Sequence, residues 1–169
     1  MDRLDTVECI GNDGTLALCV LIGLTSVSDL LNGNWGIYDV DDCKEAATIL
    51  SSALYPYIDE QRVAIRGGSA GAYTTLSSLT FAPDEISTFY KTGCGAYGCV
   101  ADVEYLTKVT EKFEMRYCYT LFGCPPDGGA WDPRNPIKNV GKLSRSLLVR
   151  DNIYLIILCG TEVDVMLLS

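Results

Sequence analysis

Residues 62–76 have the sequence Arg-Val-Ala-Ile-Arg-Gly-Gly-Ser-Ala-Gly-Ala-Tyr-Thr-Thr-Leu, and this stretch decides the fold. Its apolar opening predicts a short buried strand, and the glycine-free run after Gly71 predicts a helix that ends before Pro83. Between strand and helix, Gly67, Ser69 and Gly71 form the pattern Gly-x-Ser-x-Gly. The pattern is typical of a nucleophile elbow, a sharp strand-to-helix turn that exposes a serine hydroxyl above a sheet.

Each glycine of this pattern has a steric reason. Ser69 is expected to adopt a strained backbone conformation, and side chains at Gly67 and Gly71 would collide with the neighbouring strand and helix. The amide of Ala70 would open the helix and could donate a hydrogen bond to an oxyanion. The alternative is a glycine-rich turn that binds a phosphate or no ligand. No Gly-Lys-Ser/Thr follows, so a P-loop is not indicated.

The composition is that of one acidic globular domain. The 169 residues suffice for a single sizeable core, and hydrophobic residues make up 48% of them. The formal net charge of −9 disfavours nucleic acid and anionic membrane surfaces as partners, because both need a basic face. The apolar run at residues 16–24 is too short for a membrane span, and it follows acidic residues, unlike a signal peptide.

The eight cysteines predict neither a disulfide framework nor a metal site. No Cys-x-x-Cys pair occurs, the sequence contains no histidine, and the spacings do not match a structural zinc pattern. We therefore expect no metal, no cofactor, and mostly reduced, buried cysteines in a cytoplasmic protein. The absence of histidine also removes the imidazole that normally accepts the proton of a catalytic serine.

Helical and strand patterns alternate along the chain. The acidic run Asp39, Asp41 and Asp42 is interpreted as capping a helix over residues 44–53, with a metal cluster as the alternative. The alternation predicts an α/β layered fold with a mostly parallel sheet. The other apolar patterns predict strands at 15–24, 92–100 and 153–158, the last as an interior parallel strand, and one helix at 103–122.

Further motifs occur in a fixed order around the Gly-x-Ser-x-Gly pattern. With residues 62–71, these motifs resemble the catalytic domain of prolyl oligopeptidase-family serine peptidases, in the dipeptidyl aminopeptidase/acylaminoacyl-peptidase branch. The similarity extends over about residues 33–164. The motifs are Asn34-Trp-Gly-Ile-Tyr-Asp-Val-Asp-Asp-Cys43, Tyr73-Thr-Thr-Leu76, Leu79-Thr-Phe81, Tyr97-Gly98, Ala101-Asp102, Lys112-Phe-Glu-Met-Arg-Tyr117 and Asn135-Pro-Ile137.

The resemblance implies a partial α/β-hydrolase fold, a three-layer sandwich with a mostly parallel sheet, here without its C-terminal strand and helix. It implies that Ser69 is the nucleophile and that the Ala70 amide is half of the oxyanion hole. The family's Gly-x-x-Asp after the penultimate core strand corresponds to Gly160-Thr-Glu-Val, with Asp164 one residue late. Asp164 is therefore the candidate catalytic acid.

Several features of the family are not found in this sequence. The glycine-rich, tyrosine-containing stretch that supplies the second oxyanion donor is not recognisable in residues 1–31, and neither the catalytic histidine nor the preceding β-propeller occurs. The family's Thr-His-Lys-Phe-Glu is Thr-Glu-Lys-Phe-Glu at residues 110–114. We therefore divide the chain into an unassigned N-terminal segment, residues 1–31, and a partial peptidase domain, residues 32–169.

The first functional hypothesis is a serine-type peptidase, acylaminoacyl- or dipeptidyl-peptidase-like, that forms an acyl-enzyme on Ser69 with a peptide substrate. Without histidine, this fragment is expected to be impaired or inactive. The alternative is a catalytically dead α/β-hydrolase module used for binding or assembly, and an esterase for small acyl esters ranks third. Because a sheet without its last strand exposes an edge, self-association is also expected.

Overall fold

The computed structural model describes nine stretches of the chain. In residues 16–20, 54, 98–99, 112–115, 150, 154–159 and 162–167 only the backbone is described. The nine stretches are residues 16–20, 31–54, 57–96, 98–109, 112–126, 129–143, 145–150, 154–159 and 162–167.

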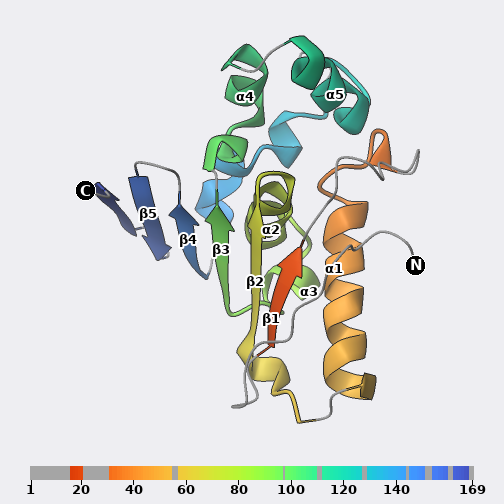
Figure 1. Ribbon diagram of the computed structural model, residues 1–169, viewed down its shortest axis with the longest axis vertical. Helices are drawn as coiled ribbons and strands as arrows, with labels where there is room; N and C mark the ends of the chain where they lie inside the picture. Colours follow the sequence, from red (N-terminus) through yellow and green to blue (C-terminus); the bar gives the residue numbers. More distant parts are fainter. Residues whose placement is uncertain are drawn as a thin grey trace.

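Six strands form one sheet in which the strand order follows the sequence (Figure 1). Strands β1 to β4 are parallel, so their carboxyl ends lie at the same edge of the sheet. Strands β5 and β6 run antiparallel to their neighbours. The strands are β1 (Leu16–Val20), β2 (Val63–Gly68), β3 (Thr92–Ala96), β4 (Ser146–Arg150), β5 (Tyr154–Cys159) and β6 (Glu162–Leu167).

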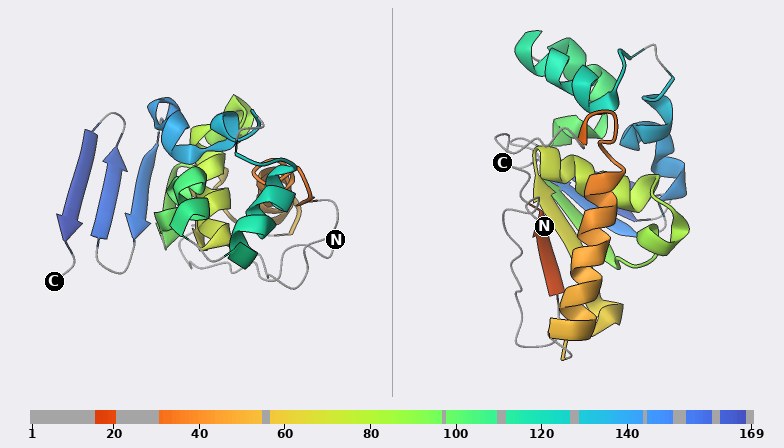
Figure 2. Two further views of the ribbon diagram at one scale, coloured as in Figure 1. Left: turned by 90° about the horizontal axis from the view of Figure 1, so that it is seen from above. Right: turned by 90° about the vertical axis from the view of Figure 1, so that its right-hand side faces the viewer.

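The helices α1 (Tyr38–Ile49), α2 (Ala70–Thr80) and α3 (Asp84–Ser87) pack on one face of this sheet (Figure 2). Right-handed crossovers between strands that follow one another in order require this arrangement. No helix within the described stretches covers the opposite face, so these stretches contain two of the three expected layers. Helices α4 (Val103–Val109) and α5 (Lys112–Phe122) lie beyond the carboxyl ends of the parallel strands (Figure 1).

Four short 3-10 helices and one π-helical turn complete the described elements. Among the helices of the described stretches, none combines the length and the apolar character needed to cross a membrane. The 3-10 helices are Glu60–Arg62, Gly98–Ala101, Asp132–Arg134 and Pro136–Lys142, and the π-helical turn, Leu50–Leu54, follows α1.

Helix α2 is buried along almost its whole length, although half of its residues are polar or glycine. Buried hydroxyls need hydrogen-bond partners. The hydroxyls of Thr75, Ser78 and Thr80 donate to backbone carbonyls four residues earlier, at 2.7 to 2.9 Å. These bonds within the helix allow a polar sequence to occupy the centre of the helical layer.

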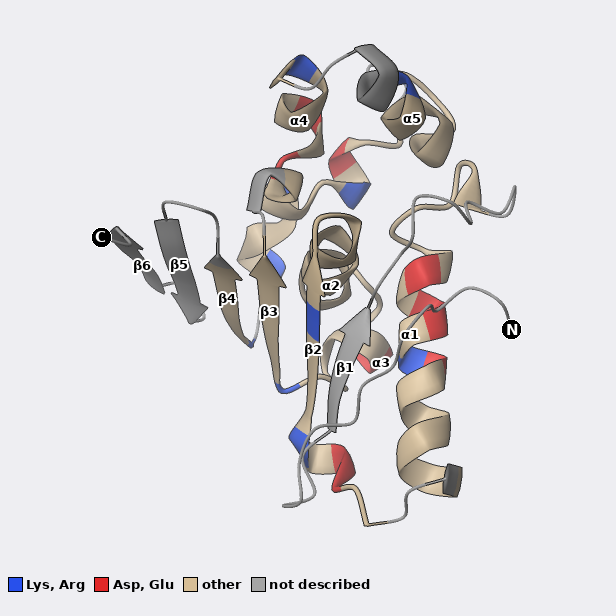
Figure 3. Ribbon diagram, viewed as in Figure 1, with Lys and Arg blue, Asp and Glu red and all other residues tan. Residues whose placement is uncertain are grey.

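The buried carboxylate of Asp39 joins α1 to α2. One oxygen accepts a hydrogen bond from the Gly36 amide at 2.6 Å, and the other accepts from the Thr74 hydroxyl at 2.6 Å. The first contact ties the carboxylate to the loop before the helix, and the N-cap residue Ile37 makes no side-chain cap hydrogen bond, so the capping role predicted for the acidic run is not what the structure shows. The second is a tertiary contact that the sequence did not predict. Figure 3 shows acidic residues in red at the first turns of α1.

Glycines allow α2 to approach β2 and β3 closely. A Cβ added to Gly67 would lie 2.3 Å from the carbonyl carbon and oxygen of Gly71, whereas one added to Gly95 would lie 3.5 Å from the Ala72 Cβ. Gly67 and Gly95 are register partners in β2 and β3. The collision predicted for a side chain at Gly67 is therefore confirmed.

The predictions for β2 and α2 are confirmed, whereas the other helices differ from expectation. Helix α1 begins at Tyr38, before the predicted residue 44, so Asp39, Asp41 and Asp42 lie within the helix rather than ahead of it. The predicted helix 103–122 is two helices, α4 and α5, and residues 110–111 between them lie outside the described stretches. Not every apolar residue of this segment faces the core, because Tyr105 and Val109 are 55% exposed.

The C-terminal strands also differ from expectation. The parallel strand beside β3 is β4, which was not predicted, and the run expected as an interior parallel strand forms antiparallel β5. Only three residues separate β4 from β5, and a parallel connection needs a crossover of a dozen or more. Strand β1, from the segment left unassigned, pairs with β2 in the same sheet.

The Asp39 carboxyl should make the stability of the protein depend on pH. Burial raises its pKa from 3.8 to about 6, against the hydrogen bonds from Thr74 and Gly36. The pKa of Asp39 is higher in the folded state than in the unfolded chain. Its carboxyl group therefore contributes most to the free energy of unfolding below pH 4, and this contribution falls between pH 4 and 6. Between pH 4 and pH 6, we expect the free energy of unfolding of Asp39→Asn, measured with urea, to rise by about 3 kcal/mol relative to that of wild type.

The matched control is Asp41→Asn, which removes an exposed carboxylate from the same helix and should leave the contribution of Asp39 in place. A stability difference between wild type and Asp39→Asn that is the same at pH 4 and pH 7 would contradict the assignment.

The glycine contact should make Gly67 far less tolerant of a side chain than its register partner. Gly67→Ala drives a Cβ into backbone atoms of Gly71, so we expect a loss of about 3 kcal/mol or failure to fold. Gly95→Ala meets only an ordinary van der Waals contact and should change the free energy of unfolding by less than about 1 kcal/mol. Equal tolerance of the two substitutions in denaturant unfolding would show that the contact is not limiting.

Candidate functional site

Ser69 connects β2 to α2 in an unusual backbone conformation. Its φ is 52° and its ψ is −119°, and among the described residues no other non-glycine residue has a positive φ. Such a conformation costs a non-glycine residue on the order of 1–3 kcal/mol and persists only where the surroundings enforce it. The Ser69 residue is exposed, so the strained turn presents it at the surface.

Main-chain hydrogen bonds fix this turn on both sides. The Ser69 amide donates to the Ala96 carbonyl at 3.1 Å, which places the turn against the carboxyl end of β3. The Ser69 carbonyl accepts from the amides of Ala72 at 2.9 Å and Tyr73 at 3.2 Å, in the first turn of α2. With the close approach of Gly67 to Gly71, these bonds leave the turn little freedom to relax.

The amide of Ala70 is the first of helix α2. In the described part of the chain this amide has no acceptor, as expected for one of the first four amides of a helix. The helix dipole adds partial positive charge at this end. The Ser69 hydroxyl and the Ala70 amide are thus neighbours at an electropositive helix terminus, which suits them to a reaction in which a carbonyl oxygen becomes negatively charged.

Tyr73, one helical turn after Ser69, links this turn to an aromatic cluster. Its ring centroid lies 4.0 Å from that of Trp35, and the ring of Phe122 lies 5.7 Å from Trp35 and 4.2 Å from Trp131. The Tyr73 hydroxyl donates to the Arg134 carbonyl at 2.9 Å. The tryptophans of the cluster are the two tryptophans of the chain.

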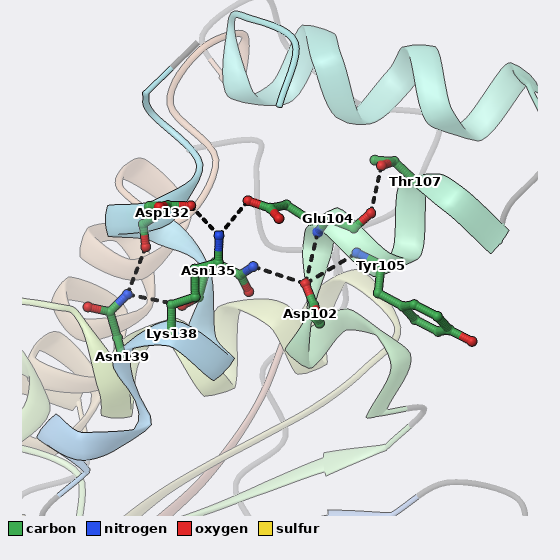
Figure 4. A network of polar contacts seen from close by, with 8 residues as sticks. All are labelled: Asp102, Glu104, Tyr105, Thr107, Asp132, Asn135, Lys138 and Asn139. Carbon is green, nitrogen blue, oxygen red and sulfur yellow. Dashed lines mark hydrogen bonds and ion pairs between the residues drawn. The ribbon is translucent and has the colours of Figure 1, made fainter. Parts of the chain in front are cut away.

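Polar contacts also connect α4 to the segment before β4 (Figure 4). The Asp102 carboxylate accepts from the amides of Glu104 and Tyr105, and the Asn135 side chain donates to the same oxygen at 3.0 Å. Partial burial raises the pKa of Asp102, but these hydrogen bonds outweigh it and hold the pKa below its usual value. Lys138 forms ion pairs with Glu104 and Asp132.

Neither Arg134 nor the Asn135–Asp102 pair has a role predicted from the sequence, although the two motifs that contain the pair are among those that resemble the family. A signal was available. Arg134 is a basic residue inside a loop otherwise rich in proline and glycine, next to Asn135-Pro-Ile137. Its partners, however, are backbone carbonyls far away in the sequence, which no local pattern reveals.

The structure brings together four of the five predicted site residues, Gly67, Ser69, Ala70 and Gly71. Asp164 lies within β6, paired with Ile157 of β5. Strand β6 is four positions from β2 in the sheet order, which corresponds to about 19 Å. The described backbone therefore does not bring Asp164 next to Ser69; the Asp164 side chain lies outside the described part, and its role stays a prediction.

No residue of the described stretches offers Ser69 the usual catalytic base. The sequence contains no histidine, and no hydrogen bond to the Ser69 hydroxyl occurs within those stretches. In the same stretches, no group of three or more acidic or cysteine side chains is arranged to hold a metal ion. Cys43, Cys94 and Cys124 form no disulfide with another residue of the described stretches.

The chain is similar to solved peptidase structures over nearly three quarters of its length. A puromycin-hydrolyzing peptidase of Mycobacterium tuberculosis is 30% identical, with a TM-score of 0.63, over 73% of this chain and 18% of the other. A puromycin hydrolase is 32% identical, with a TM-score of 0.61, over 72% of this chain and 17% of the other. The chain thus spans less than a fifth of the length of either relative.

A more distant likeness supports the fold alone. The acylaminoacyl peptidase of Pyrococcus horikoshii is 17% identical, with a TM-score of 0.58, over 73% of this chain and 19% of the other. The similarity to these solved structures identifies the sheet and its helices as a partial α/β-hydrolase fold, as expected. No curated protein matches the chain.

The prolyl oligopeptidase family matches residues 27–161, which is most of the chain. The match contains β2, the Ser69 turn, α2 and the segments that carry Arg134 and Asn135. The chain therefore belongs to the prolyl oligopeptidase family.

Proposed function

We propose that this chain carries the nucleophile and one oxyanion donor of a serine peptidase. The observation that supports this most is the conformation of Ser69, exposed at a strand-to-helix turn with φ 52° and ψ −119°. A non-glycine residue stays in such a conformation only where function or packing demands it. In this proposal the turn is a nucleophile elbow, with Gly67 and Gly71 as its elbow glycines.

The proposed reaction is acyl transfer. The Ser69 Oγ attacks the carbonyl carbon of a peptide or related amide, and the Ala70 amide stabilises the negative charge that develops on the carbonyl oxygen. The amine then leaves, and water hydrolyses the acyl-enzyme. The hydroxyl proton must pass to a general base, and these 169 residues contain no imidazole. We therefore propose that turnover by these residues alone is several orders of magnitude slower than in a peptidase with a complete triad.

The substrate class follows from the relatives. Two proteins at least 30% identical to this chain hydrolyse puromycin according to their descriptions. Puromycin and short peptides are therefore the first substrates to test. The acidic net charge makes nucleic acid and anionic membranes poor partners.

A catalytically dead binding module is the second candidate. Two observations favour it: the sequence has no histidine, and the backbone of Asp164 lies four strand positions from β2. In that case the strained turn would be retained as architecture from an ancestral peptidase.

Covalent labelling with a fluorophosphonate separates the two candidates. If Ser69 is an activated nucleophile, the purified protein should gain the mass of one probe, and Ser69→Ala should abolish labelling. Ser52→Ala is the matched control, because Ser52 is exposed in the π-helical turn after α1, and this variant should label no differently from wild type. Wild-type protein that remains unlabelled after long incubation would contradict the peptidase proposal and favour the binding module.

A further inference from the structure

Helices α4 and α5 lie at the same end of the sheet as Ser69. In Figure 1 both helices stand beyond the carboxyl ends of β2 and β3. The chain leaves β3 at Ala96, whose carbonyl accepts the Ser69 amide, and enters α4 through the 3-10 helix Gly98–Ala101. The two helices, here called the α4–α5 segment, therefore start directly at the Ser69 turn.

Asn135 holds the beginning of this segment. Its side chain is fully buried and donates at 3.0 Å to the Asp102 oxygen that also caps α4 through the amides of Glu104 and Tyr105 (Figure 4). A hydrogen bond from a buried amide to an ionised carboxylate contributes more stability than an exposed ion pair does. Asn135 therefore fixes α4 more firmly than does Lys138, whose ion pair with Glu104 is partly exposed.

Arg134 holds the end of the segment. Its guanidinium donates to the carbonyl of Phe122, the last residue of α5, at 2.9 Å, and to those of Gly33 and Trp35 at 3.0 Å. It also stacks 4.8 Å from the Phe122 ring centroid, and its Nε donates to Ala130. A cation at the carboxyl end of a helix is favourable both through hydrogen bonds and through the helix dipole.

The same residue reaches the Ser69 turn through its own backbone. The Arg134 carbonyl accepts the Tyr73 hydroxyl at 2.9 Å, and the Tyr73 amide donates to the Ser69 carbonyl. Two adjacent residues thus contact the start of α4, the end of α5 and the first turn of α2. We infer that Arg134 and Asn135 are positioning residues that hold both ends of the α4–α5 segment in place over the Ser69 turn.

Amide hydrogen exchange tests this placement without any need for activity. Asn135→Ala should increase exchange in residues 98–109 at least about tenfold, because α4 loses the anchor of its cap. Arg134→Lys keeps the charge but cannot reproduce the planar fork, so exchange should rise in residues 112–122 and 31–36. Lys138→Met is the matched control. Lys138 lies in the 3-10 helix that follows Asn135, and its substitution should change exchange in α4 less than threefold.

The second readout rests on the proposed function. A displaced α4–α5 segment should hinder a large probe more than a small one, so Asn135→Ala should slow labelling of Ser69 by a peptidyl phosphonate about tenfold. Labelling by a small alkyl fluorophosphonate should change less than threefold. A merely structural loss would slow both probes equally.

The outcomes separate the inference from the proposed function. Unchanged exchange in α4 in Asn135→Ala, or an equal increase in Lys138→Met, overturns the inference. An equal loss of labelling by both probes overturns it as well, even where exchange rises. If wild type is not labelled at all, the proposed function fails, and the exchange measurement alone decides whether the two residues hold the segment. If Arg134→Lys does not fold, Asn135→Ala still gives both readouts.

Discussion

The contact between Gly67 and Gly71 is the constraint on which the rest of the structure depends. Strand β2 and helix α2 come so close that a single Cβ at Gly67 would lie 2.3 Å from backbone atoms. This closeness forces a sharp turn between them, and Ser69 takes the positive φ that the turn requires. The strain at Ser69 and its exposure at the turn are both consequences of this one steric fact.

A second constraint is that the buried positive charge of Arg134 needs hydrogen-bond acceptors. Arg134 is 9% exposed, and within the described stretches it contacts backbone carbonyls rather than a carboxylate. Those carbonyls belong to the loop before α1, to the end of α5 and to the preceding turn, so one side chain ties separate segments together. Removing a buried charged donor would leave several carbonyls without partners, which is costlier than losing an exposed ion pair.

The sequence alone predicted the structural features that depend on local geometry. The strand, the serine turn and helix α2 follow from the spacing of Gly67, Ser69 and Gly71, and the structure agrees to within a few residues. It did not predict that β5 would be antiparallel, because a run that is apolar on both faces fits either direction. Nor did it reveal Arg134, whose carbonyl partners lie up to 101 residues away in the sequence. The Asp164 assignment relied on a family pattern displaced by one residue, and the sheet order separates its backbone from Ser69.

The most direct test of the account compares Ser69→Gly with Ser69→Ala in equilibrium unfolding. Alanine keeps the Cβ and hence the strain, whereas glycine adopts a positive φ at little cost. After allowance for the greater entropy of an unfolded chain with glycine, Ser69→Gly should be more stable than Ser69→Ala by about 1 kcal/mol. If Ser69→Ala is equally stable or more stable, the turn stores no strain, and the account of Ser69 as a residue held in place by Gly67 and Gly71 is wrong.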